Sequence, residues 1–124
     1  MIYLDTHVVV WLYQKDLLRF SSSLLRHIEE ASLLISPMVP LELQYLCETG
    51  RIREGAEPII RYLRNAVGLS LCALPFEEVV MVAIDQQWTR DPFDRIIVAQ
   101  AMVQKRPLVT KDDTIRAYYD HAIW

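Results

Sequence analysis

Glycine, cysteine and long apolar runs are all scarce in this chain of 124 residues. Three glycines are too few for a glycine-rich phosphate-binding loop. Two cysteines, Cys47 and Cys72, can pair only once and lie among apolar neighbours, so we expect reduced core thiols and no disulfide framework. The longest hydrophobic runs, Val8 to Tyr13 and Val79 to Ile84, have six residues each, whereas a membrane-spanning helix needs about 20.

The chain also lacks a basic leader and an excess of positive charge. It begins Met-Ile-Tyr-Leu-Asp, with no basic segment before an apolar stretch, so we expect no signal peptide and a cytoplasmic location. The 13 basic and 16 acidic residues give a formal net charge of -3. Taken as a total, this charge argues against a broad basic surface for nucleic acid.

Short apolar runs alternate with helical patterns along the chain, and its 52% hydrophobic content excludes a disordered protein. We expect a single domain over residues 1–124. The expected strands are Ile2 to Leu4, Leu33 to Ser36, Leu69 to Leu74, Pro107 to Thr110 and Ala122 to Trp124. The expected helices are Val8 to Tyr13 with Thr6 as its cap, Ser21 to Ala31, Pro37 to the residue before Gly50, Pro58 to Val67, Phe76 to Gln87, Asp91 to Lys105 and Asp112 to Tyr119. This alternation predicts an α/β fold with a parallel sheet covered on both faces, which binds ligands at the carboxyl ends of its strands.

Acidic residues follow two of the expected strands. Asp5 comes directly after the first strand and Asp112 after the fourth, so both should lie at the same edge of a parallel sheet. Asp91 and Asp94 begin the helix that precedes the fourth strand. Aspartate at such positions caps a helix more often than it catalyses a reaction, and Asp5, Asp91 and Asp112 all suit the capping role.

Glu42 and Asp94 are harder to explain as caps. Glu42 stands between two leucines, and Asp94 faces Ile97 and Val98 one helical turn later, so both carboxylates should be partly buried. A buried charge requires a partner, and one divalent cation would serve several carboxylates at once. Mg²⁺ favours a few carboxylates together with water and substrate phosphate. No cysteine–histidine pair has zinc-ligand spacing, and the three isolated histidines are not expected to be catalytic.

Four segments of the chain carry these acids: Met1 to His7 (MIYLDTH), Glu42 within PLEL, Asp91 to Ala101 (DPFDRIIVAQA) and Leu108 to Asp112 (LVTKD). Together they resemble the PIN domain, and in particular the VapC toxins of bacterial and archaeal toxin–antitoxin systems. The resemblance covers essentially the whole chain, and the segment from Asp91 is its most specific part. It implies a three-layer α/β/α sandwich with a central parallel sheet of four to five strands.

The resemblance also implies an endoribonuclease that hydrolyses RNA phosphodiester bonds with Mg²⁺, for which Mn²⁺ can substitute. Four acids would hold the metal and carry out catalysis: Asp5, Glu42, Asp94 and Asp112. Three residues would support them: Asp91, Thr6 and Thr110. Family members usually form homodimers, and most are inhibited by a small antitoxin protein that inserts a segment near the acids. Some apolar residues between Val8 and Phe20 could accept a partner helix, although core packing accounts for most of them.

RNA binding requires positive charge elsewhere, because the acids repel phosphate. We expect RNA contacts from five arginines and a tryptophan: Arg51, Arg53, Arg61, Arg64, Trp88 and Arg90. Arginine binds phosphate through paired N–H groups, and an indole face can stack on a base. The alternative is a solvated helix face on which the arginines pair with Glu48, Glu54 and Glu57.

Other readings of the acids remain open. A receiver-like signalling domain needs an acidic pair after the first strand, and a haloacid-dehalogenase-like phosphatase needs Asp-x-Asp there, whereas this chain has Asp5-Thr6-His7. A third alternative is a PIN domain that binds RNA or sequesters an antitoxin with little catalysis.

The net charge has a different meaning once the acids are seen as a site. Without the four proposed metal ligands, the charge of -3 becomes +1. The acidity is then concentrated at one place, and the total no longer argues against an RNA substrate.

Overall fold

The computed structural model describes all 124 residues, Met1 to Trp124. Five parallel strands form one sheet in the order β3-β2-β1-β4-β5. Their bounds are β1 (Ile2–Leu4), β2 (Leu33–Ile35), β3 (Ser70–Leu71), β4 (Leu108–Val109) and β5 (Ala122–Ile123). The central position of β1 between β2 and β4 places the residues that follow these three strands at one edge of the sheet, and the predicted parallel sheet is confirmed.

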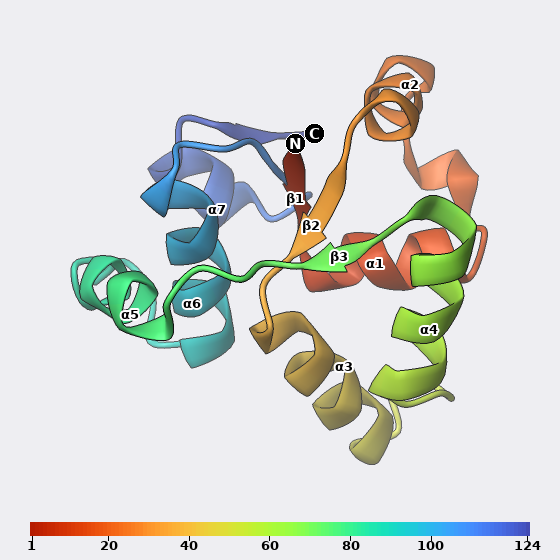
Figure 1. Cartoon of the computed structure of the whole chain (residues 1–124), viewed down its shortest axis with the longest axis horizontal. Helices are drawn as coiled ribbons and strands as arrows, with labels where there is room; N and C mark the ends of the chain where they lie inside the picture. Colours follow the sequence, from red (N-terminus) through yellow and green to blue (C-terminus); the bar gives the residue numbers. More distant parts are fainter.

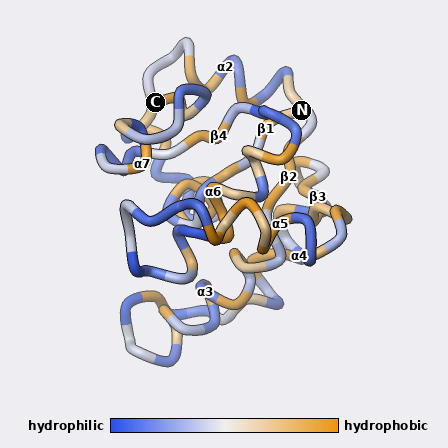
Figure 2. The backbone as a smooth tube through the Cα atoms, turned by 90° about the vertical axis from the view of Figure 1, so that its left-hand side faces the viewer, coloured by the Kyte–Doolittle hydropathy of each residue, from blue (hydrophilic) through white to orange (hydrophobic).

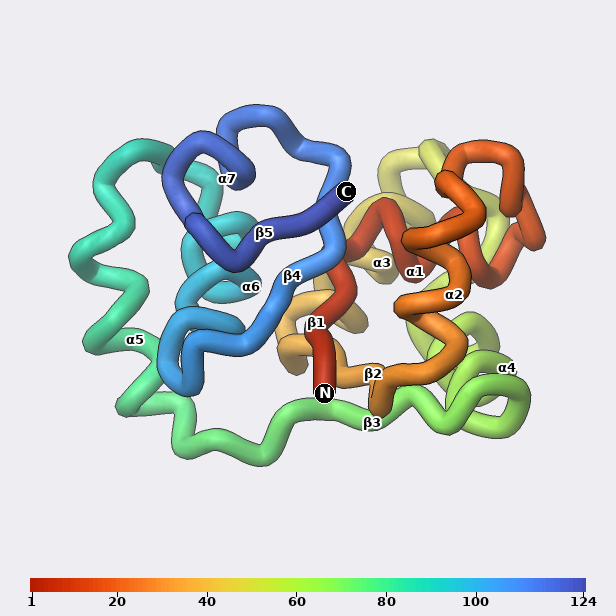
Figure 3. Tube along the Cα trace, turned by 90° about the horizontal axis from the view of Figure 1, so that it is seen from above, coloured from red at the N-terminus to blue at the C-terminus, as the bar shows by residue number.

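Seven α-helices and one 3-10 turn connect the strands. They are α1 (Thr6–Tyr13), η1 (Leu17–Arg19), α2 (Ser22–Glu30), α3 (Met38–Glu48), α4 (Ala56–Val67), α5 (Phe76–Ile84), α6 (Pro92–Val103) and α7 (Asp113–Tyr118). Helices α5, α6 and α7 lie on one side of the sheet, and α1, α2 and α4 lie on the other (Figure 3). Helix α3 lies below the carboxyl ends of the central strands (Figure 1) and contacts α1, α4 and α6. This arrangement confirms the predicted three-layer α/β/α fold.

The core forms where the sheet meets its two helical layers. All three residues of β1 are buried, as are both residues of β4. Hydrophobic stretches run through these strands in Figure 2. Such continuous apolar strands are typical of a parallel sheet that helices cover on both faces. None of the helices has the length and apolar character that a membrane span requires.

Several element boundaries differ from the sequence prediction. Asp5, not Thr6, caps α1, because its carboxylate accepts a hydrogen bond from the backbone N–H that begins the helix. The third strand is limited to Ser70–Leu71, since it lies at the edge of the sheet and pairs only with β2. Helix α4 begins two residues before Pro58 and ends, as predicted, at Gly68, which has a left-handed φ of 70°.

The two cysteines are free, as predicted, but only one is a core residue. Cys72 is buried, and its sulfur accepts a hydrogen bond from the hydroxyl of Tyr3. Cys47 is only half-buried, because its thiol faces the carbonyl of Arg53 in the exposed connection after α3. The expectation that both thiols lie in the core is therefore wrong for Cys47.

Candidate functional site

A pocket of about 350 Å³ opens at the carboxyl edge of the sheet. Its walls carry five carboxylates: Asp5, Glu42, Asp91, Asp94 and Asp112. The other lining residues are Thr6, His7, Val10, Trp11, Leu46 and Ile52. The structure thus brings together all four acids predicted as metal ligands, from four distant parts of the chain.

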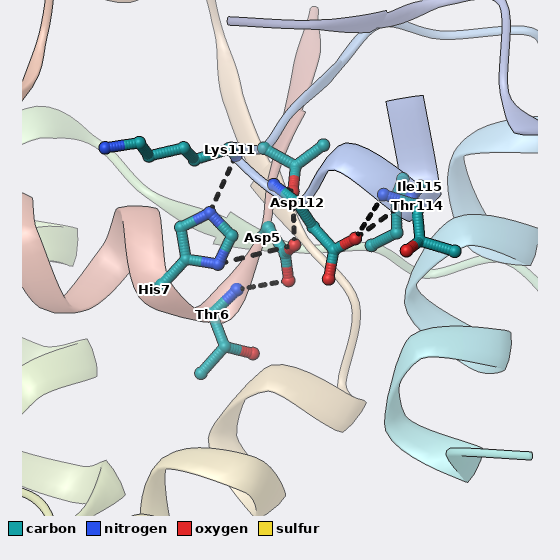
Figure 4. Close-up of polar contacts among 8 residues, drawn as sticks. Asp5, Thr6, His7, Lys111, Asp112, Thr114 and Ile115 are labelled. Carbon is teal, nitrogen blue, oxygen red and sulfur yellow. Dashed lines mark hydrogen bonds and ion pairs between the residues drawn. The ribbon is translucent and has the colours of Figure 1, made fainter. Parts of the chain in front are cut away.

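Asp5 is the most firmly held of these acids, with only 4% of its surface exposed. Its Oδ1 accepts a hydrogen bond from the backbone N–H of Thr6 at 2.7 Å, and its Oδ2 accepts one from the hydroxyl of Thr110 at 2.6 Å (Figure 4). The Thr110 hydroxyl also accepts the backbone N–H of Asp112 at 3.1 Å. Thr110 therefore links the acid after β1 to the acid after β4, in the supporting position predicted for it.

Asp91 and Asp112 also cap helices while they line the pocket. Oδ1 of Asp112 accepts the backbone N–H groups of Thr114 at 2.8 Å and Ile115 at 3.0 Å (Figure 4). Oδ1 of Asp91 accepts the N–H of Phe93 at 2.9 Å. Each cap engages only Oδ1. The capping role predicted for these aspartates is confirmed, and it leaves one oxygen of each carboxylate for other partners.

Glu42 on α3 and Asp94 on α6 have no ion pair with any basic side chain. Burial raises the pKa of Asp94 to about 7, and repulsion by Asp91, Asp5, Asp112 and Glu42 adds to this rise. Burial also raises the pKa of Glu42, against a smaller lowering by the nearby Thr6 hydroxyl. The pocket therefore holds negative charge that the protein's own residues do not compensate.

The donor set fits a hard divalent cation. Carboxylate oxygens predominate in the pocket, no cysteine lines it, and the buried hydroxyl of Thr6 has no hydrogen bond of normal geometry. Such oxygen ligands suit Mg²⁺ or Mn²⁺. No three His, Cys, Asp or Glu side chains are placed to hold one ion together. The arrangement therefore favours one or two direct carboxylate ligands with water completing the shell, which is the usual mode for Mg²⁺.

The six predicted RNA-contact residues lie on three segments: Arg51 and Arg53 after α3, Arg61 and Arg64 on α4, and Trp88 and Arg90 before α6. The first two flank Ile52, which lines the acid pocket. Arg61 pairs with Glu57 at 2.6 Å, as the alternative of a solvated helix face predicts. The ring of Trp88 stacks on that of Tyr118 with 5.3 Å between centroids.

His7 and Trp11 line the pocket although the sequence prediction did not include them. Nε2 of His7 accepts the backbone N–H of Lys111 at 2.9 Å (Figure 4), and burial lowers the pKa of this imidazole. Its ring packs against Trp11 at 4.9 Å. The spacing i, i+4 on a helix beginning at the first acid was the available signal. Nδ1 of His7 also lies 3.6 Å from Oδ2 of Asp5, two residues earlier (Figure 4).

The charge of Asp94 predicts a pH-dependent stability of the metal-free protein. Because its folded pKa of about 7 exceeds the usual 3.8, protonation favours the folded state, and this stabilisation is lost as pH rises through 7. Asp94→Asn removes the titration. Since Asp94 keeps some solvent contact, we expect the variant to be more stable at pH 8 by about 1 kcal/mol, or roughly 3–6 °C in Tm. Melting curves in EDTA at pH 8 and pH 5 measure the difference in Tm between the variant and the wild type, which should be smaller at pH 5. An equal difference in Tm at both pH values would contradict the raised pKa of Asp94.

Comparison with known proteins agrees with the fold. The PIN domain family model matches residues 2–120. The chain is 31% identical over 122 residues to Ribonuclease VapC22 of Mycobacterium tuberculosis. The matched region covers 93% of this chain and 89% of that protein. Among solved structures, it is similar to a chain of VapBC2 from Rickettsia felis bound to a promoter DNA fragment (TM-score 0.68, 19% identity, 99% and 96% of the two chains). It is also similar to a chain of a toxin–antitoxin complex from Klebsiella pneumoniae (TM-score 0.63, 14% identity, 100% and 97%). With its acid pocket at the carboxyl edge of the sheet, the chain belongs to the PIN domain family.

Proposed function

We propose that this protein is a metal-dependent endoribonuclease that hydrolyses RNA phosphodiester bonds and acts as the toxin of a toxin–antitoxin pair. The observation that carries this proposal is the gathering of five carboxylates around one pocket with no basic partner for Glu42 or Asp94. The similarity to Ribonuclease VapC22 supports RNA as the substrate. Such a substrate would be met in the cytoplasm, which is where we propose that the protein acts.

Asp5, Glu42, Asp94 and Asp112 would hold Mg²⁺, or Mn²⁺ in its place, two of them directly and the others through bound water. When bound, the metal supplies an activated water and stabilises charge on the phosphate oxygens. Asp5, fixed by Thr6 and Thr110, and Asp94 are the first choice as direct ligands. Glu42 and Asp112 would complete the shell or orient the attacking water.

The test is cleavage of an end-labelled single-stranded RNA by the purified protein. Cleavage should occur with Mg²⁺, stop in EDTA and return when Mn²⁺ is added in excess. Because water attacks instead of the 2′-hydroxyl, the products should carry no 2′,3′-cyclic phosphate. Cleavage that persists in EDTA, or cyclic phosphate ends, would contradict the proposal. RNA binding without cleavage under any metal would favour the alternative of a non-catalytic PIN domain.

The antitoxin is proposed to bind a second, apolar pocket of about 470 Å³ between α1, α2 and α4. Ten of its 12 lining residues are hydrophobic, and Leu12 and Leu17 from the apolar N-terminal stretch are among them. Next to them, Leu18 is 99% exposed. A partner segment would bury these side chains. Coexpression with a small candidate antitoxin, followed by co-purification, tests the assignment.

A homodimer is also proposed. Helix α5 exposes Phe76 and Met81 at 63% each and Ile84 at 53%, and burial of such side chains commonly drives association. Sedimentation of the purified protein measures the oligomeric state. A monomer at micromolar concentration would contradict this part of the proposal.

A further inference from the structure

A phosphate that approaches the acid pocket needs positive charge that the acids do not cancel. Arg61 and Arg116 each pair with an acid through a terminal nitrogen, and Nε and one terminal nitrogen of Arg95 donate to the carbonyls of Ala83 and Ile84. Two cations, Arg19 and Lys111, lie near the rings of Trp11 and Trp124. Trp11 lines the acid pocket, and Trp124 packs against Trp11.

Lys111 is the first of these cations. Its backbone N–H donates to His7, and its side chain extends past the imidazole, away from Asp5 and Asp112 (Figure 4). Its ammonium lies 6.0 Å from the centre of the Trp124 ring and pairs with no carboxylate. Although Lys111 is next to Asp112 in sequence, its charge therefore does not neutralise the site.

Arg19 is the second. Its guanidinium carbon lies 4.5 Å from the centre of the Trp11 ring, and it forms an ion pair with Asp16 in which only its Nε donates, at 2.6 Å. That contact leaves the two terminal nitrogens available for phosphate. Trp11 lines the acid pocket, and its ring centre is 5.7 Å from that of Trp124. The two cations therefore lie near two neighbouring indole rings, and one of these, Trp11, lines the acid pocket.

We propose that Arg19 and Lys111 bind backbone phosphates of the RNA strand beside the phosphate that is cleaved. This subsite, the Arg19/Lys111 patch, rests on the proposed nuclease function for its substrate. Contact with an indole face restrains each cation, and the arginine fork suits phosphate oxygens. The patch is separate from the predicted arginines on α4 and on the connection after α3.

The test is binding of a fluorescein-labelled single-stranded RNA, followed by anisotropy in EDTA so that no cleavage occurs. Arg19→Ala/Lys111→Ala should raise Kd about tenfold and reduce the slope of log Kd against log salt concentration by about 1–2. The control Arg26→Ala/Arg106→Ala removes the same charge from exposed residues that do not line the acid pocket, and its Kd should change less than about twofold. Equal Kd values for the two double variants would overturn the patch.

Cleavage kinetics in Mg²⁺ separate the patch from the nuclease assignment. If the nuclease assignment and the Arg19/Lys111 patch are both correct, the patch variant should have a higher KM than the wild type and the same kcat. If the wild type does not cleave but RNA binding still depends on the patch, the nuclease assignment fails and the patch stands. If the wild type cleaves and the patch variant keeps its KM, the patch fails alone.

Discussion

Asp5→Asn should abolish RNA cleavage while the protein stays folded. The substitution removes the charge that would hold the metal but keeps an amide oxygen that can cap α1, and its amide N–H can donate to the Thr110 hydroxyl. The rate should fall at least about a hundredfold, the scale seen when one group that stabilises transition-state charge is removed. Cleavage assays with Mg²⁺, alongside melting curves, measure the two effects separately.

Asp5→Ala is the informative comparison for this residue. Alanine leaves the buried Thr110 hydroxyl and the N–H at the start of α1 without their acceptor, because both bond to the Asp5 carboxylate. We expect a loss of about 1–2 kcal/mol or more in stability, in addition to lost cleavage. Wild-type cleavage by Asp5→Asn would remove Asp5 from the proposed metal site.

Asp94→Asn should cause a similar loss of cleavage with the opposite effect on stability. Asp94 makes no ion pair, and its pKa of about 7 marks a carboxylate held among other negative charges. Its replacement should stabilise the metal-free protein at pH 8 while it removes a proposed ligand. An activity loss that accompanies a gain in stability is expected of a residue kept for its chemistry.

The matched control is Asp91→Asn, three residues earlier on the same helix start. Asp91 is exposed, and its side chain caps α6 through Phe93, a role that asparagine can fill. We expect Asp91→Asn to keep much more activity than Asp94→Asn under the same metal concentration. The reverse order would exchange the roles of the two acids within the DPFD motif.

The sequence predicted the acid pocket because its residues are attached to features that have a pattern. Asp5 and Asp112 follow apolar strands, and the edge they share follows from a parallel sheet. Glu42 could be singled out because a carboxylate among leucines must be partly buried. In Asp5, Asp91 and Asp112, one carboxylate oxygen caps a helix while the residue lines the pocket, so the capping and metal-binding interpretations are compatible.

Other contacts of the site could not be predicted from local patterns. Nε2 of His7 accepts the backbone N–H of Lys111, which any residue except proline would supply at that position. Trp11 meets Trp124, the last residue of the chain, only because β5 pairs beside β4. Such contacts depend on the closed tertiary structure, and neither partner identifies the other in sequence.

Binding of Mn²⁺ to the protein without RNA tests the central claim most directly, because it depends on no substrate and no trace nuclease can imitate it. Electron paramagnetic resonance of free Mn²⁺ measures the bound fraction. At pH 8 the wild type should bind Mn²⁺, and Asp5→Asn/Asp94→Asn should bind it at least about tenfold more weakly. The control is Asp113→Asn/Asp120→Asn, which removes the same charge from exposed acids outside the pocket and should bind Mn²⁺ like the wild type. Equal affinity in all three proteins would contradict a metal site built from these acids.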